Sequence, residues 1–368
     1  MQQMRNAHIR FLLIGALVWL SACIEPIEVV TGTQQDTLVV DGTVTSKVNP
    51  QTGQRELACT ILLSSAEPFN SASGIVVSRP ITGAQVYVQD KQGNKWPVPE
   101  KTELQNNKVT VIKGNYGFLV SSTESQVGNV FTVFIKLPNG KEYQSQPEVL
   151  QAVPPIQELE FIFKEFVEVV KNGAGENVEK KTPAFEVSVT VNDPANAQNA
   201  YRWETEGIFQ YQTNPPEILP PPASICWSYA GRINKQIEAI DDSRTNGQRI
   251  KLPVAVVPFD LQTRYQAIVR QYSLTPKAYE FWRLYRQQQT SVGSITDPAP
   301  AQIRGNLFNV KDPSEVVIGY FGTSEVNEKF IIINRSLYGP MPGAPFVVLT
   351  RDCRGLYSNS THIPPFGF

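Results

Sequence analysis

Residues 130–145 read VFTVFIKLPNGKEYQS, and this stretch decides the fold class of the chain. Every second residue from Phe131 to Leu137 is apolar, so one face of an extended strand would be buried and the other would face water. Asn139 and Gly140 follow at once, and this pair tolerates the positive φ angles of a tight hairpin turn. The stretch therefore predicts an antiparallel β-hairpin that packs by one face.

The same pattern of short, alternating, turn-bounded segments recurs on both sides of this hairpin. Upstream it covers residues 36–46 and 56–65, and downstream it covers residues 156–164 and 185–193. Strands of this length and spacing favour a β-sandwich. We therefore expect a mainly β protein, in which an amino-terminal immunoglobulin-like or regulatory-like β-sandwich is followed by a larger β-rich domain with one packed α-helix.

A proline-rich segment separates the two predicted domains. Residues 151–157 read QAVPPIQ, and paired prolines remove backbone donors that a helix or a sheet needs. The sequence thus predicts a β-sandwich domain over residues 36–150, a β-rich domain over residues 156–361 and a short tail over residues 362–368.

One segment of the second domain has the period of a helix rather than a strand. Residues 273–289 read SLTPKAYEFWRLYRQQQ, in which Thr275 is placed to cap a helix and Pro276 suits its first turn. Apolar and aromatic residues then recur at helical spacing, at Ala278, Phe281, Trp282 and Tyr285. We expect a helix near residues 275–289 whose aromatic face packs on the domain, and a partner-binding face is the alternative.

The amino terminus has the features of a bacterial lipoprotein signal. Residues 11–23 read FLLIGALVWLSAC, follow two arginines and no acid, and contain an apolar run too short to cross a bilayer as a helix. The last four letters match the lipobox, the cleavage motif whose cysteine is acylated. We expect a signal peptide over residues 1–22, a lipid anchor on Cys23 that holds the chain at the outer membrane, and a tether over residues 23–35. The sequence leaves open whether the protein faces the periplasm or the cell exterior.

The charge of the chain argues against one class of partner. The full sequence has 33 basic and 34 acidic residues, and cleavage after residue 22 would remove two arginines and no acid. A mature chain with 31 basic and 34 acidic residues lacks the positive surface that nucleic acids require. We therefore expect no nucleic-acid partner, and the membrane is the first partner that the sequence predicts.

Three cysteines remain once Cys23 is acylated. Cys59 lies in a strand-like run, where a buried thiol is expected. Cys226 and Cys353 both lie in polar, loop-flanked settings, and outside the reducing cytosol we predict that they form a disulfide. A zinc site is the competing use of these cysteines, but it lacks CxxC spacing and histidines, so no metal or other cofactor is expected.

The sequence contains no recognisable catalytic constellation. After cleavage a single histidine remains, His362 in the predicted tail, and a serine or cysteine triad would depend on it. Glu204 and Glu206 share a strand face, but carboxylates two residues apart on one strand rarely flank a substrate bond, so we expect them to form a solvated face. Asp241 and Asp242 begin a segment that resembles a calcium loop, but its glycine is out of register. We expect a binding protein rather than an enzyme.

A proline-rich loop is the candidate binding edge. Residues 213–224 read TNPPEILPPPAS, which cannot form an inner strand, and a plain connecting loop is the alternative. The candidate site comprises Pro215, Pro216, Pro220, Pro221, Pro222, Trp227 and Tyr229. An aromatic stripe upstream could cradle a sugar or a peptide, although core packing is the more frequent use, and its members are Tyr201, Trp203, Phe209 and Tyr211.

Residues 278–326, from AYEFW to GTSEV, resemble the hallmark region of a lipoprotein family of Bacteroidota, domain-of-unknown-function family 4249. The segments VVDGTVT at residues 39–45 and PITGAQVYVQDKQGN at residues 80–94, together with Cys226 and Cys353, fit the same family. Members are typically encoded near TonB-dependent outer-membrane receptors, so the resemblance implies transport or nutrient capture. No catalytic residues carry over from this family.

Two functions from different classes follow. The first is a lipid-anchored, non-catalytic binding or accessory component that works with a TonB-dependent outer-membrane transporter in nutrient uptake. The second is a structural or adhesive envelope lipoprotein without cargo, and a glycan-acting hydrolase is a distant third. The sequence specifies neither the ligand nor the partner receptor.

The lipid anchor is tested by replacing its thiol. The variant Cys23→Ser removes the acylation site, and we expect it to be unprocessed or released from membranes, because the acyl chains supply the attachment. Membrane fractionation, with mass determination of the amino-terminal peptide, measures this. Full recovery of the variant in the outer membrane would show that anchoring does not depend on Cys23.

Overall fold

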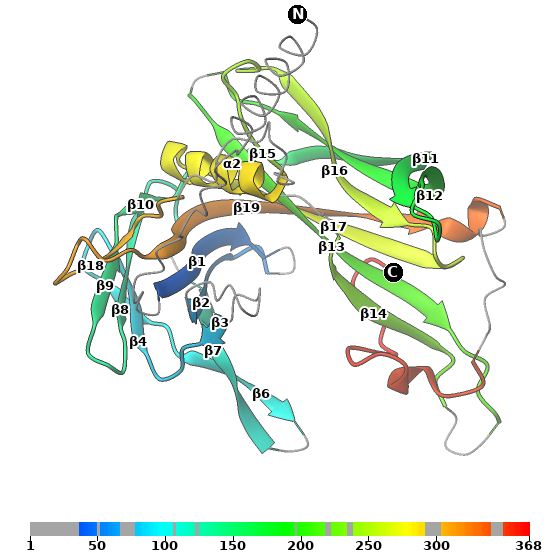
Figure 1. The fold of residues 1–368 in the computed structure, drawn as a ribbon, viewed down its shortest axis with the longest axis horizontal. Coiled ribbons are helices and arrows are strands. Elements are labelled where there is room, and N and C mark those ends of the chain that lie inside the picture. The colour runs from blue at the N-terminus through cyan, green and yellow to red at the C-terminus, as the bar shows by residue number, and fades with distance from the viewer. Residues whose placement is uncertain are drawn as a thin grey trace, which may run out of the picture.

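The computed structural model describes residues 37–49, 52–66, 78–105, 108–121, 125–195, 197–217, 222–233, 238–290, 303–339 and 349–368. The predicted signal peptide, Cys23 and the tether lie outside these residues, as do Pro220 and Pro221 of the candidate loop. In the described part the fold is mainly β with one α-helix, α2 (Pro276–Thr290), which confirms the fold class predicted from the sequence (Figure 1). None of the helices described is long and apolar enough to span a membrane.

A long sheet of ten strands crosses the described structure. Its order is β14-β13-β17-β19-β1-β2-β7-β6, with β15 paired to β13 and β3 paired to β2. The strands are β1 (Thr37–Val48), β2 (Arg55–Ala66), β3 (Ser78–Pro80), β6 (Glu100–Gln105), β7 (Lys108–Ser121), β13 (Ala200–Gln212), β14 (Ile225–Arg232), β15 (Glu238–Asp241), β17 (Arg264–Ser273) and β19 (Ile318–Asn334).

Two smaller sheets pack on the long sheet. The six-stranded sheet has the order β18-β9-β8-β4-β5 with β10 paired to β8, and the three-stranded sheet has the order β11-β12-β16. Their strands are β4 (Gln85–Asp90), β5 (Lys95–Pro97), β8 (Val130–Lys136), β9 (Glu142–Ser145), β10 (Glu148–Val149), β11 (Ile156–Lys171), β12 (Asn177–Asn192), β16 (Arg249–Pro258) and β18 (Leu307–Asn309). Two short 3-10 helices follow near the carboxyl end, η1 (Arg335–Leu337) and η2 (Cys353–Gly355).

The hairpin that first indicated the fold class is β8–β9. Its strands pair antiparallel, and Phe131, Val133 and Ile135 are all buried, as their alternation predicted. Gly140 has a φ of +84°, the left-handed conformation that the Asn-Gly pair indicated. The local signals in this stretch therefore fix both the turn and the buried face.

The strand β19 connects the two halves of the chain. It pairs antiparallel with β17 through residues 326–334 and parallel with β1 through residues 318–325. In addition, β18 pairs with β9 of the amino-terminal half. The division of the chain into two domains near residues 150–156 stays a prediction. The long sheet contains strands from both sides of this division, because β19 pairs with β1.

One face of the long sheet forms both hydrophobic cores. In the first core, Val40 and Ile61 pack with Val133 of the six-stranded sheet. In the second core, Trp203 and Ile333 pack with the three-stranded sheet, including its residues Phe185, Val187 and Val257. Phe321 lies in the first core and Ile333 in the second, and because both are odd-numbered residues of β19 they point to the same side. We call the opposite side the open face.

The helix α2 covers one end of the open face. Thr275 caps it, since its Oγ1 accepts a hydrogen bond from the backbone N–H of Ala278 at 3.2 Å. Phe281 is buried and its ring lies 4.9 Å from that of Tyr320 on β19, which runs beneath the helix (Figure 1). The predicted aromatic face of the helix thus packs on the sheet, with only Tyr285 at its far end left exposed.

A buried carboxylate joins the helix to the sheets. Glu148 on β10 is 2% exposed and accepts hydrogen bonds from Tyr320 Oη at 2.6 Å, Thr275 Oγ1 at 2.8 Å and Asn306 Nδ2 at 3.2 Å. Asn306 also bonds the backbone of Phe321 through both its amide atoms. Burial raises the pKa of Glu148 above its usual value of 4.5, although these three donors oppose the shift.

We expect Glu148 to stabilise the fold by accepting hydrogen bonds, and its negative charge to be dispensable. The variant Glu148→Leu removes the acceptor of three buried donors, of which Asn306 keeps its bond to Phe321, and should lower the free energy of unfolding by about 2–5 kcal/mol. The variant Glu148→Gln keeps an acceptor oxygen for Tyr320 and Asn306 and should cost less. Urea unfolding at pH 7 measures both, and equal losses for the two variants would contradict the interpretation.

The pH dependence has a definite sign. Between the pKa of Glu148 in the unfolded chain and its raised pKa in the folded chain, the unfolded state has lost its proton while the folded state keeps it. Rising pH therefore destabilises the folded protein through this window. We expect the stability of Glu148→Gln relative to the natural protein to increase as pH rises from 4.5, and a difference that is constant from pH 4 to 8 would contradict this.

Candidate binding surface

The candidate loop and its aromatic residues do not form one exposed site. Pro216 is exposed and Pro215 and Pro222 are half-buried, but Trp227 and Tyr229 lie on the strand β14, which corrects their interpretation as loop residues. Trp227 is 8% exposed, whereas Tyr229 is 53% exposed. Residues two apart on a strand point to the same side, so the difference in exposure reflects what covers each ring, and Phe368 packs against that of Trp227.

The carboxyl-terminal segment covers this edge of the long sheet. Cys226 and Cys353, the pair predicted from their settings, are joined by a disulfide with Cα atoms 5.8 Å apart. Trp227 and Thr361 exchange two backbone hydrogen bonds of 2.8 and 2.9 Å, which places the segment beside β14 (Figure 1). Cys59 is a free, buried cysteine, as expected.

The last residues of the chain pack on the open face. The side-chain amide of Gln266 donates to the carbonyl oxygen of Phe366 at 2.8 Å, and the Phe366 ring lies 5.8 Å from that of Phe330. Phe368 stands edge-on to Trp227 at 6.0 Å. The predicted tail is therefore a packed segment, and His362 within it is exposed.

The aromatic stripe on β13 belongs to the interior. Tyr201, Trp203 and Tyr211 are fully buried, and Phe209 is partly buried against the same cores. The Tyr201 hydroxyl donates to Asp193 at 2.6 Å. Core packing, the more frequent use of such a stripe, is what the structure has, so these rings form no cradle for a ligand.

Glu204 forms part of a buried charge cluster rather than a solvated face. It accepts hydrogen bonds from Arg232 at 2.8 Å, Tyr272 at 3.1 Å and Arg202. Burial alone would raise the pKa of Glu204, but the guanidinium groups of Arg202 and Arg232 outweigh it and lower that pKa. Arg202 also lies between the rings of Tyr272 and Trp282, at 4.5 and 4.4 Å, so this cluster fixes α2 to the sheet.

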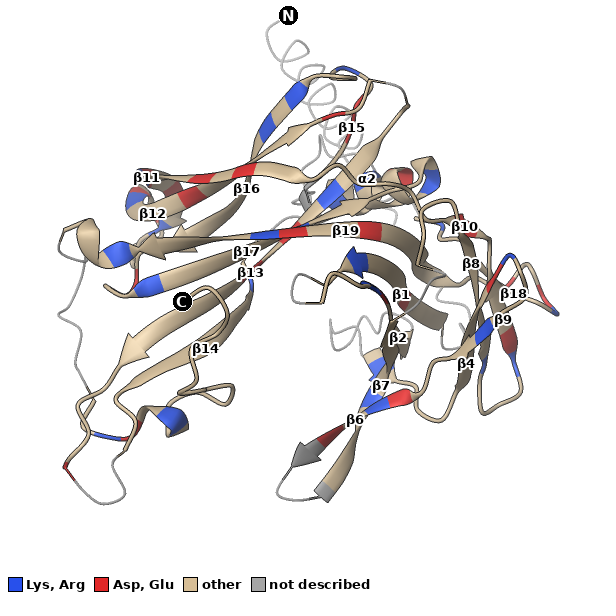
Figure 2. Ribbon diagram, turned by 180° about the vertical axis from the view of Figure 1, so that it is seen from behind, with Lys and Arg blue, Asp and Glu red and all other residues tan. Residues whose placement is uncertain are grey.

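Arg270 lies beside this cluster on the open face. It forms ion pairs with Glu206 at 2.8 Å and with Glu328 at 2.5 Å. Acidic and basic residues accordingly lie side by side along β19 in Figure 2. Glu204 and Glu206, the two carboxylates that the sequence analysis considered as an acid and base pair, therefore both form ion pairs with arginines. They lie two residues apart on the same strand, β13.

A groove of about 480 Å³ lies in the open face, between this charge cluster and the β6–β7 hairpin. Strand register brings its floor together: Thr45 pairs with Ala58, and Thr60 pairs with Gly117. These residues are small, whereas larger side chains from neighbouring strands surround them. The polar and charged side chains that line the groove are Thr45, Lys47, Glu56, Thr60, Lys101 and Arg270.

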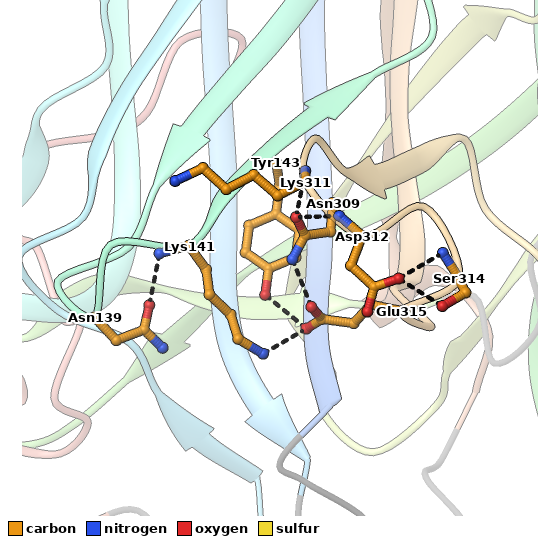
Figure 3. Close-up of polar contacts among 8 residues, drawn as sticks. All are labelled: Asn139, Lys141, Tyr143, Asn309, Lys311, Asp312, Ser314 and Glu315. Atoms are coloured by element: carbon orange, nitrogen blue, oxygen red, sulfur yellow. Dashed lines mark hydrogen bonds and ion pairs between the residues drawn. The ribbon is translucent and has the colours of Figure 1, made fainter.

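A second polar cluster surrounds Glu315, in the loop before β19 (Figure 3). Its carboxylate accepts hydrogen bonds from Lys141 Nζ at 3.0 Å, Tyr143 Oη at 2.8 Å and Asn309 Nδ2 at 2.5 Å. Burial would raise the pKa of Glu315, but these donors prevail and lower it. These hydrogen bonds hold the loop against β9. Because the Glu315 carboxylate is already bonded to three donors, we do not consider this cluster a binding site.

The arrangement of the described residues does not suggest a metal centre, since no group of three or more histidine, cysteine, aspartate or glutamate side chains in them could hold an ion. A family model described as domain of unknown function (DUF4249) matches residues 24–329. The chain belongs to this family. No curated protein matches it. The DUF4249 span includes every residue that lines the groove, whereas Cys353 and the carboxyl-terminal segment lie beyond it.

The disulfide should contribute strongly to stability. It closes a loop with a sequence separation of 127 residues, so replacing both cysteines with alanine should lower the free energy of unfolding by about 2–5 kcal/mol. Denaturant unfolding of Cys226→Ala/Cys353→Ala measures the loss. Cys59→Ala serves as the control for removing a thiol without breaking a cross-link, and an equal loss there would mean that the bridge itself contributes little.

Proposed function

We propose that this protein is a lipid-anchored component of the outer membrane that binds a ligand without transforming it and works with a TonB-dependent transporter in nutrient uptake. The observation that carries the proposal is the groove in the open face. Its volume of about 480 Å³ lies within the range of roughly 300–1,000 Å³ that is usual for ligand sites. It combines hydroxyl, charged and apolar side chains, which is the mixture that recognition requires.

The position of the groove also favours binding. Its floor is formed by β1 and β2, which have paired neighbours on both sides in the long sheet. Side chains on such strands are held more precisely than side chains on loops. The packing of the first core on the reverse side of the same strands adds to this rigidity.

Two parts of the proposal, the membrane anchor and the transporter partner, are based on the sequence. The lipobox at residues 20–23 supports the lipid anchor. The transporter partner is inferred from the family resemblance, and the chain belongs to that family. The exposed ring of Tyr229 on β14 offers a contact surface away from the groove. A protein that holds a ligand in the groove can therefore contact a barrel through β14, the edge strand of the long sheet.

Copurification tests the transporter partner. The full chain, captured from native envelopes in mild detergent, should bring with it a large β-barrel protein of the outer membrane. Cys23→Ser, which lacks the anchor, should recover much less of the barrel because it no longer resides in the same membrane. Mass spectrometry of the captured material measures both.

Two outcomes would contradict the proposal. If the chain resides in the outer membrane but no barrel accompanies it, the structural or adhesive role becomes the better interpretation. If the purified chain turns over members of a glycan panel, the non-catalytic part is wrong.

A further inference from the structure

We infer that the groove binds an acidic oligosaccharide, a chain of sugars that carry carboxylates. This inference rests on the proposed binding function and names the chemistry of the ligand. Two lysines, Lys47 and Lys101, line the groove, and in the described part of the chain neither forms an ion pair with a carboxylate. An ammonium group that is not paired with a carboxylate of the protein can form charge-assisted hydrogen bonds to a carboxylate ligand.

The environment of Lys47 leaves its charge available. The register places Glu56 directly across from it on β2, but Glu56 accepts a hydrogen bond from the side chain of Asn49 at 2.6 Å instead. Arg270 nearby is different, since Glu206 and Glu328 both engage it. Arg270 is thus ion-paired within the protein, whereas Lys47 forms no ion pair among the described residues.

Lys101 is held over the other end of the floor. Its Nζ lies 3.4 Å from Thr60 Oγ1, and a Cβ atom on Gly117 would come within 2.4 Å of its Cε. Any side chain at position 117 would therefore displace the lysine. The glycine allows the Lys101 ammonium group to lie low over β2 and β7, next to a hydroxyl.

The two lysines are spaced for a ligand with more than one charge. Lys47 lies across from Glu56, and the Lys101 ammonium group lies beside Thr60, so the two are separated by four residues along the sheet and by one to two strand spacings across it, which is about 14–16 Å. A single small anion cannot reach both ammonium groups at this distance. A chain molecule with carboxylates at intervals can.

The floor between the lysines favours a sugar over a peptide. Its backbone groups are already paired, because β1 and β2 have neighbours on both sides, so the main chain of a peptide would find no partners there. The available groups are the hydroxyls of Thr45 and Thr60 and the hydrocarbon surface of Ala58 and Leu119. Sugars present hydroxyl groups at their rims and C–H groups on their faces, and both match this floor.

The direct test is calorimetric titration of the full chain, purified in mild detergent, with tetramers of galacturonate and of mannuronate. At least one should bind, and its fully methyl-esterified form, which has the same sugars without the charges, should bind at least about tenfold more weakly. Binding should weaken as salt increases. Tripolyphosphate serves as the non-sugar anion.

Variants of the groove give changes of opposite sign. Lys47→Gln and Lys101→Gln should each weaken binding of the acidic tetramer by about tenfold. Glu56→Gln removes the one carboxylate in the groove that repels the ligand and should tighten binding several-fold. Lys171→Gln, on β11 in the sheet behind the open face, is the matched control and should change nothing. Circular dichroism checks that each variant is folded.

Several outcomes would overturn the inference. They are the absence of binding to both acidic tetramers, equal binding of the methyl ester, and binding of tripolyphosphate as tight as that of the sugar. Unchanged affinity in folded Lys47→Gln and Lys101→Gln would also overturn it. If binding fails while the barrel still copurifies, the ligand class is wrong and the transporter role stands; if binding holds without a barrel, the reverse follows.

Discussion

The strand β1 lies between β2 and β19, and its parallel pairing with β19 joins the two halves of the chain into one sheet. At Gly319 the backbone has a φ of +102°, and a Cβ there would lie 1.9 Å from the carbonyl oxygen of Val40. Only glycine permits this close approach. The remaining features depend on it, since β19 supplies Tyr320 to Glu148 and brings Tyr272 of β17 toward Lys47 of β1.

Local patterns predicted much of this structure, and long-range pairing explains the rest. The β8–β9 hairpin and the helix α2 followed from periodicity and turn chemistry, because their signals lie within a few residues of each other. The pairing of β1 with β19 has no such signal. Lys47, Lys101 and Arg270 come from three distant segments, so nothing in the sequence indicated that they would line one groove. The burial of Glu148 was equally hidden, because its partners lie far along the chain.

For the candidate loop, a local signal led to a wrong prediction. Prolines before β14 suggested that Trp227 and Tyr229 continue a loop, but these residues form the edge strand of the long sheet. The carboxyl-terminal segment then pairs with Trp227 and is tied to the strand by the disulfide. This arrangement shields an edge that would otherwise present unpaired backbone groups to other chains. The disulfide therefore protects a sheet edge in addition to closing a long loop.

The late position of β19 has a consequence for synthesis. The amino-terminal half of the chain emerges first, and β1 then has β2 on one side but no partner on the other until residues 318–325 follow. During that interval an open strand edge, flanked by the apolar side chains of Val40 and Val44, is exposed to other nascent chains. The long sheet can therefore be completed only after the carboxyl-terminal half of the chain has been made.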